Sequence, residues 1–124
     1  MLLKDFYKVI SLEQTTAQQF TAIILVNENH EVFKGHFPEN PIMPGVCMMQ
    51  IIKELTENIT KSALVVQSLS NVKFMALINP FATPELRLEL DITDEENTVK
   101  VKNVSYFNET VALKLSIVYK KTGL

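Results

Sequence analysis

The feature that most constrains the fold is an apolar run from Gly45 to Asn58, which contains no proline and no internal glycine. About fourteen residues is too long for an average strand, so the run predicts a helix of roughly 20 Å. Its apolar residues fall on nearly every face, which indicates a helix enclosed by other elements. Among its few polar residues, Gln50 and Glu54 stand one turn apart on one face.

A proline-rich loop precedes this run. Pro38, Pro41 and Pro44 stand within seven residues, and His36 lies just before the first of them. Proline fixes its own φ and restricts the residue before it, so the loop is expected to be stiff. We therefore expect His36 to be held near the start of the predicted helix.

Strand patterns flank the helix on both sides. Residues 20–26 are apolar and β-branched, which predicts a strand, and residues 30–33 are expected to form a short extended piece. Residues 63–78 predict one long strand, or two pieces with a bend near residues 68–71.

The clearest alternation in the chain is that of Leu86, Leu88, Leu90 and Ile92 with charged residues between them. It predicts a strand with one wet face. Two further alternating stretches, separated by turns, predict three successive antiparallel strands. One apolar helix and several antiparallel strands indicate an α+β fold in which a curved sheet wraps a long central helix.

Composition narrows the class of protein. With 124 residues we expect one domain, residues 1–124. Hydrophobic residues make up 47% of the chain and charged residues 21%, which is ordinary for a globular protein and excludes a disordered or fibrous one. The net charge of −2, with Arg87 as the only arginine, argues against a nucleic-acid partner.

Cys47 is the only cysteine, which excludes an intrachain disulfide and fits a reducing compartment. The N-terminal charges are too closely spaced for a signal peptide, and no apolar run reaches membrane-spanning length. We therefore expect a cytoplasmic protein without a membrane partner. The sequence has no His, Cys and Asp pattern at metal-ligand spacing and no glycine-rich phosphate loop, so no metal or cofactor is expected.

One motif resembles that of a known family. Gly35-His36-Phe37-Pro38, followed by Asn40-Pro41-Ile42-Met43-Pro44-Gly45-Val46, is similar to the signature of the 3-hydroxyacyl-acyl-carrier-protein dehydratases, which are hot-dog-fold enzymes of fatty-acid synthesis. Residues 69–80 also resemble a later strand and proline turn of that family. The resemblance covers roughly residues 30–92. It implies a hot-dog fold and a protein that assembles as a homodimer or a higher oligomer. The implied partners are thioesters of acyl carrier protein or of coenzyme A.

The resemblance also implies roles for single residues. His36 would be the catalytic histidine, and the N–H of Gly45 would bind the thioester carbonyl. Phe37, Met43, Val46 and Met49 are expected to line the substrate site. For Phe37 and the methionines, plain core packing is an equal alternative.

The family places an acid fourteen residues after the histidine, where this chain has Gln50. Dehydration needs a base for the C2 proton, donors for the enolate-like oxygen and a proton for the departing hydroxyl. An amide has no proton to give. Glu54 could supply it if its side chain reaches the site, or His36 could return its captured proton through a water.

Three functions therefore stay open. The leading one is a 3-hydroxyacyl-acyl-carrier-protein dehydratase-like enzyme of fatty-acid or related lipid biosynthesis, with catalytic residues His36 and Gln50. The second is an acyl thioesterase, and the third is a catalytically weakened subunit paired with an active paralogue. Cys47, in the first helical turn, is either core filler or a nucleophile.

Overall fold

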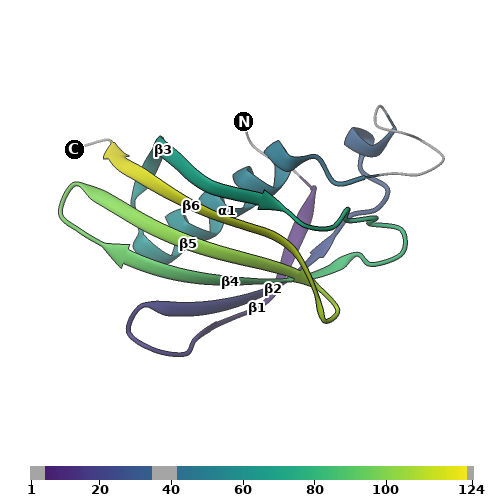
Figure 1. Cartoon of the computed structure of the whole chain (residues 1–124), viewed down its shortest axis with the longest axis horizontal. Helices are drawn as coiled ribbons and strands as arrows, with labels where there is room; N and C mark the ends of the chain where they lie inside the picture. Colours follow the sequence, from purple (N-terminus) through teal and green to yellow (C-terminus); the bar gives the residue numbers. More distant parts are fainter. Residues whose placement is uncertain (1–4, 35–41, 123–124) are drawn as a thin grey trace.

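The computed structural model of the protein describes residues 5–34 and 42–122. These residues form a six-stranded sheet and one long helix, with a short 3-10 helix between β2 and α1 (Figure 1). The elements in chain order are β1 (Tyr7–Gln14), β2 (Gln19–Val26), η1 (Glu31–Phe33), α1 (Gly45–Thr60), β3 (Ala63–Phe74), β4 (Glu85–Asp94), β5 (Thr98–Phe107) and β6 (Thr110–Thr122). The sheet order is β1-β2-β4-β5-β6-β3, and every neighbouring pair is antiparallel.

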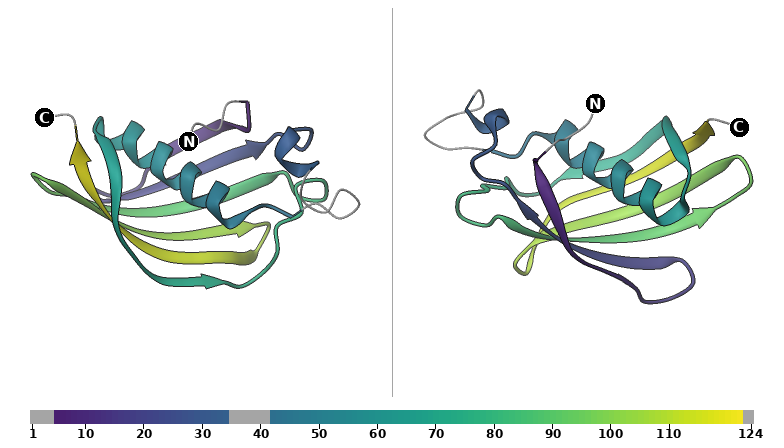
Figure 2. Two further views of the ribbon diagram at one scale, coloured as in Figure 1. Left: turned by 90° about the horizontal axis from the view of Figure 1, so that it is seen from above. Right: turned by 180° about the vertical axis from the view of Figure 1, so that it is seen from behind.

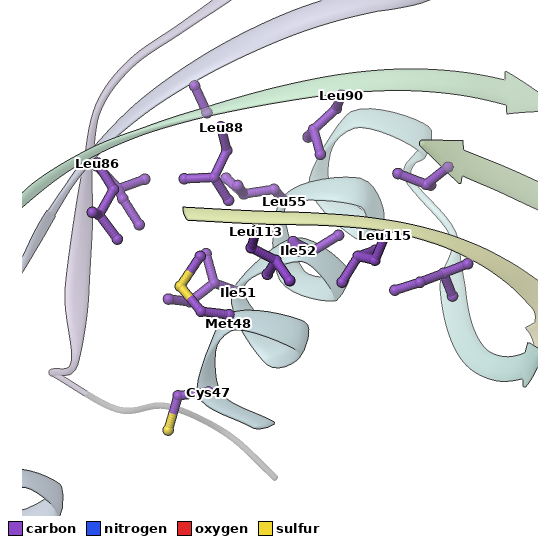
Figure 3. Close-up of a cluster of buried hydrophobic side chains, with 14 of the residues drawn as sticks. Cys47, Met48, Ile51, Ile52, Leu55, Leu86, Leu88, Leu90, Leu113 and Leu115 are labelled. Atoms are coloured by element: carbon purple, nitrogen blue, oxygen red, sulfur yellow. The ribbon is translucent and has the colours of Figure 1, made fainter. Parts of the chain in front are cut away.

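The helix lies across the concave face of the curved sheet (Figure 2). One side of α1 is buried against leucines of the central strands (Figure 3). The closely packed set comprises Cys47, Met48, Ile51, Ile52 and Leu55 from the helix, and Leu86, Leu88, Leu90, Leu113 and Leu115 from the sheet. Burying a side chain of this size stabilises the fold by about 1.5–3 kcal/mol, so this layer holds the helix on the sheet. The α+β prediction is confirmed.

The alternation in the C-terminal half predicted the strands correctly. The four apolar residues of β4 are buried against the helix, while Glu85, Arg87, Glu89 and Asp91 face the other side of the sheet. Strands β4, β5 and β6 follow one another as an antiparallel meander, as predicted. Turns at residues 95–97 and 108–109 join them.

The structure differs from the predictions for the N-terminal half in two places. Strand β1 was not predicted, because a bulge between Val9 and Ser11 interrupts its alternation and most of its side chains are exposed at the sheet edge. Residues 31–33 form a 3-10 helix, and only His30, which precedes it, is extended. The Nδ1 atom of His30 accepts a hydrogen bond from Val32 N at 3.1 Å, which satisfies a free amide at the start of the turn.

The helix runs two residues past the predicted end and stops at Lys61, which adopts the left-handed conformation with φ 56°. Residues 63–74 form one strand, as in the first of the two predicted alternatives, but the strand ends four residues before the predicted end at residue 78. Its pairing with β6 is irregular between Val66 and Ser68 and between Ser70 and Lys73. The expected bend thus takes the form of bulges within a continuous edge strand.

Candidate functional site

The first turn of α1 presents backbone donors. Pro44 precedes it and has no side-chain group that could cap the helix. The N–H groups of Cys47 and Met48 both donate to the Pro44 carbonyl, at 3.1 and 3.3 Å. The amides of Gly45 and Val46 come before these bonds and have no intrahelical acceptor. They lie at the positive end of the helix dipole, where a developing negative charge on a ligand oxygen is stabilised.

Gly45 is required here by its contact with Phe74. A Cβ atom at position 45 would lie 2.8 Å from Cζ of Phe74 and 3.1 Å from its Cε1. The Phe74 ring, which is 59% exposed, therefore packs over the bare Cα of the first helical residue. Any side chain at position 45 would displace this ring.

A cavity of about 310 Å³ opens beside this contact. It lies between the start of α1, the end of β3 and the beginning of β6. Its lining is mainly apolar and includes Met43, Gly45, Met48, Phe74, Leu77 and Leu113. An apolar hollow next to free backbone donors suits an acyl chain that ends in a polar carbonyl.

A larger hollow of about 450 Å³ lies at the start of β1 and the end of β2, lined by residues such as Tyr7, Asn27 and Pro84. No helix N-terminus contributes to its lining. The cavity beside Gly45 is therefore the candidate site, because it combines an apolar wall with the N-terminal amides of the long helix.

Gln50 belongs to a hydrogen-bonded group of three side chains. Its Nε2 donates to Oε2 of Glu54 at 3.0 Å, and the Tyr7 hydroxyl donates to Oε1 of the same carboxylate at 2.8 Å. Burial, together with the hydrogen bond to Glu54, raises the pKa of Tyr7 well above its usual range. The phenol therefore stays protonated and remains a donor at neutral pH.

Gln50 and the cavity are on different sides of the helix. Met48 lines the cavity, and Gln50 follows two residues later, which is a rotation of about 200° around the helix axis. Gln50 is not among the residues that line the cavity. Within one protomer, the described residues thus bring Gly45 and Met43 together but leave Gln50 on the opposite flank.

The other predicted site residues divide in the same way. Met43 is buried and lines the cavity, whereas Met49 is half-buried and the Val46 side chain is 65% exposed; neither lines it. His36 and Phe37 lie outside the described residues.

Cys47 is buried, and burial raises the pKa of its thiol. A raised pKa disfavours the thiolate, so Cys47 behaves as core filler rather than as an activated nucleophile.

Tyr7 was not singled out from the sequence. It stands 47 residues before Glu54, on a strand whose pattern is broken by a bulge. No local signal links the two residues. The contact between Gln50 and Glu54, by contrast, could be predicted from their i to i+4 spacing on the helix. Their side chains are hydrogen-bonded across the turn that separates them.

Comparison with known proteins decides the family. A sequence model described as ApeI dehydratase, of the ApeI-like family, matches residues 12–115. The chain belongs to the ApeI-like dehydratase family. It is also 30% identical over 103 residues to the 3-hydroxyacyl-[acyl-carrier-protein] dehydratase FabZ of Caulobacter sp. (strain K31), with 77% of this chain and 63% of the relative covered.

The FabZ of Listeria welshimeri is 45% identical over 47 residues, which is 38% of this chain and 31% of that protein. The chain therefore spans less than two thirds of the length of these dehydratases.

Solved structures confirm the hot-dog fold. The dehydratase heterocomplex ApeI:P from Xenorhabdus doucetiae superposes with a TM-score of 0.73 at 18% identity, covering 91% of this chain and 96% of that one. The putative thioesterase yhdA from Lactococcus lactis gives a TM-score of 0.71 at 11% identity and covers 98% of both chains. Among the described residues, no helix has the length and apolar character needed to cross a membrane.

Proposed function

We propose that the protein dehydrates 3-hydroxyacyl thioesters carried by acyl carrier protein or coenzyme A. The observation that carries this proposal is the apolar cavity at the start of α1, where no side chain caps the helix. Gly45 supplies an amide donor there, and the flexible side chain of Met43 lines the cavity. Membership of the ApeI-like dehydratase family and similarity to FabZ support the same reaction.

The proposed reaction uses His36 as the base. Its imidazole takes the proton from C2, and the electron pair moves onto the thioester carbonyl oxygen. The Gly45 and Val46 amides stabilise that oxygen; one such donor is typically worth about 10²–10³ in rate. The electrons then form the C2–C3 double bond as the C3–O bond breaks. The hydroxyl leaves as water with the proton that the imidazolium returns.

We also propose that two subunits make each site. Edge strand β3 carries exposed apolar side chains, including Val65, Val66 and Leu69, and its outer backbone groups have no strand beside them among the described residues. Such an edge pairs readily with another strand, here that of a second copy. Because Gln50 and the cavity lie on opposite flanks of α1 in one protomer, a partner is needed to bring Gln50 to the cavity. The resemblance to the dehydratases implies the same arrangement, in which the histidine and the helix residue facing it come from different subunits.

The replacement of the family acid by Gln50 supports two further candidates. In one, the protein hydrolyses acyl thioesters, with His36 or a water held by Gln50 involved in the attack. In the other, it is a weakened subunit that pairs with an active paralogue; its likeness in fold to a dehydratase heterocomplex makes this worth testing. The buried, unpaired Cys47 supports a reducing compartment, and we propose the cytoplasm.

One preparation separates these functions. The purified protein is incubated with 3-hydroxyacyl and with saturated acyl thioesters, and enoyl product and free thiol are followed separately. Enoyl formation that disappears in His36→Ala supports the dehydratase, and thiol release supports the thioesterase. Silence in both assays, reversed by adding a paralogue, supports the paired subunit and contradicts a self-sufficient dehydratase.

A further inference from the structure

A hollow of about 270 Å³ lies on the convex face of the sheet, which faces away from α1 (Figure 2). Strands β3, β5 and β6 form it, and each of them contributes one lysine to its lining: Lys73, Lys102 and Lys114. No aspartate or glutamate is among the lining residues. The hollow therefore gathers three positive charges and no negative charge at neutral pH.

Two of these lysines stand directly opposite each other. Lys73 and Lys114 are register partners in the antiparallel pair of β3 and β6, and both are exposed. Side chains in this relation have Cβ atoms about 5 Å apart, and like charges there destabilise a sheet. The described part of the chain places no carboxylate within salt-bridge distance of either lysine. An anion between the two ammonium groups would remove their repulsion.

The third lysine approaches from the neighbouring strand. Lys102 lies opposite Ser116, two residues along β6 from Lys114, and such diagonal neighbours are within reach of long side chains. Lys102 also lines the adjoining hollow that contains Glu89 and Asp91, although within the described chain it forms no salt bridge with either. Its charge is therefore available to the basic hollow, whose firmest members are Lys73 and Lys114.

We propose that this hollow binds a phosphate group, held mainly by Lys73 and Lys114. The ligand class follows from the donors, because a lysine ammonium group is a point charge with three N–H donors that suits phosphate oxygens. A phosphate dianion balances two facing ammonium groups, whereas a single carboxylate balances one. Asn71 and Ser116, which also line the hollow, carry uncharged donors that can bond the remaining oxygens.

The proposed phosphate site is separate from the acyl cavity. Phe74 and Leu113, the chain neighbours of Lys73 and Lys114, line the acyl cavity on the side of the sheet that carries α1. Successive side chains of a strand point to opposite faces, so the sheet stands between the two sites. An acyl thioester in the cavity leaves the hollow open, and the proposal does not depend on the dehydration reaction.

Thermal melting in phosphate and in chloride tests the proposal. At equal pH and ionic strength, about 20 mM sodium phosphate is expected to raise the Tm of the wild-type protein by about 4–6 °C over sodium chloride, because the ligand binds only the folded state. ADP is the second probe, since a nucleotide carries the same chemical group. A larger shift with ADP would identify a nucleotide as the ligand, and an equal shift would show that the phosphate group alone is recognised.

Two variants separate binding from the general stabilising effect of phosphate salts. In chloride, Lys73→Gln and Lys114→Gln are each expected to melt about 1–2 °C above the wild type, because the repulsion is gone. In phosphate the order reverses, because only the wild type has both ammonium groups. Lys120→Gln is the matched control and should follow the wild type in both salts. Lys120 is exposed on the same face of β6, and its partners Val65 and Thr98 are uncharged.

Either of two results would overturn the proposal. One is a wild-type protein whose Tm is the same in phosphate, ADP and chloride. The other is a phosphate shift that persists in full in Lys73→Gln/Lys114→Gln, which would show a general salt effect. Neither result bears on the proposed dehydration, because the two lysines lie outside the acyl cavity.

Discussion

The amide nitrogen of Gln50 lies 3.0 Å from a carboxylate oxygen of Glu54, one turn further along α1. The position at which the resemblance implies an acid thus holds an amide here, and the carboxylate of Glu54 is bonded directly to it. One of the two N–H groups of the Gln50 amide is therefore bonded to Glu54.

Gln50→Glu is predicted to raise the rate of dehydration. The new carboxyl group would meet Glu54, and two like charges at this separation raise the pKa of one of them, which then stays protonated near neutral pH. General acid catalysis is worth on the order of 10²–10⁴ in rate, so a gain of about 10²-fold in kcat is expected. The gain should vanish as the pH rises through the raised pKa, because the added proton is then lost.

The control for this variant is Asn58→Asp, which makes the same change from amide to acid on the same helix and also one turn from Glu54. Asn58 is exposed near the C-terminal end of α1. The Asn58→Asp variant should therefore dehydrate the substrate at the wild-type rate. An unchanged or lower rate in Gln50→Glu would show that the amide does not limit the reaction.

Gly45→Ala is predicted to abolish activity with little loss of stability. The added Cβ atom would lie 2.8 Å from the Phe74 ring, so the ring must move. Gly45 and Phe74 both line the proposed acyl cavity. Because Phe74 is exposed and its ring is the mobile end of a side chain, the free energy of unfolding should change by less than about 1 kcal/mol. Thermal melting and kcat/KM check the two halves of the prediction.

The second variant for this test is Gly45→Ala/Phe74→Ala. Removing the ring makes room for the Cβ atom, so the double variant should recover part of the lost kcat/KM. If it stays as inactive as Gly45→Ala, displacement of Phe74 is not the cause.

Val65→Lys is predicted to convert the protein into a monomer and to abolish activity. A lysine at edge strand β3 blocks pairing with a second β3, as charged edge residues do in other sheets. Val9→Lys is the matched control, since Val9 and Val65 are both 45% exposed but lie on opposite edges of the sheet. Sedimentation that shows the same assembly for both variants would exclude β3 as the interface.

Tyrosine ionisation is predicted to be delayed until the protein unfolds. Burial and a neighbouring carboxylate raise the pKa of Tyr7 and of Tyr119 well above the usual value, with Glu54 and Glu57 as the respective neighbours. Their contribution to stability is therefore complete below about pH 10, where free tyrosine ionises, and is lost as the pH rises beyond it. Ultraviolet titration combined with circular dichroism checks this; ionisation near pH 10 in folded protein would contradict it.

Local patterns carried most of the fold prediction. The β4 alternation fixed its buried face because a two-residue period matches a strand with one wet side. The apolar run from Gly45 predicted α1 to within two residues of its end. Strand β1 was not predicted because its bulge interrupts the two-residue period. The bond from Tyr7 of this strand to Glu54 could not be predicted either, because the two residues lie far apart in the chain.

For the candidate site, the sequence motif located Gly45 and Met43, which the fold brings to one cavity. It did not reveal that the cavity lies on the flank of α1 away from Gln50, because the cavity is closed by residues after β3 and on β6, whose positions depend on tertiary packing. The Gly45–Phe74 contact could not be predicted either, since it joins the helix to a strand whose position depends on tertiary packing.

Subunit mixing tests most directly whether two copies of the chain complete each dehydration site. His36→Ala and Gln50→Met, each inactive alone, are unfolded together, refolded and assayed for enoyl formation. If each site takes His36 from one copy and Gln50 from the other, half of the dimers are mixed with one intact site each, and about a quarter of wild-type activity returns. A mixture that stays inactive, although mixed dimers form, would contradict the claim.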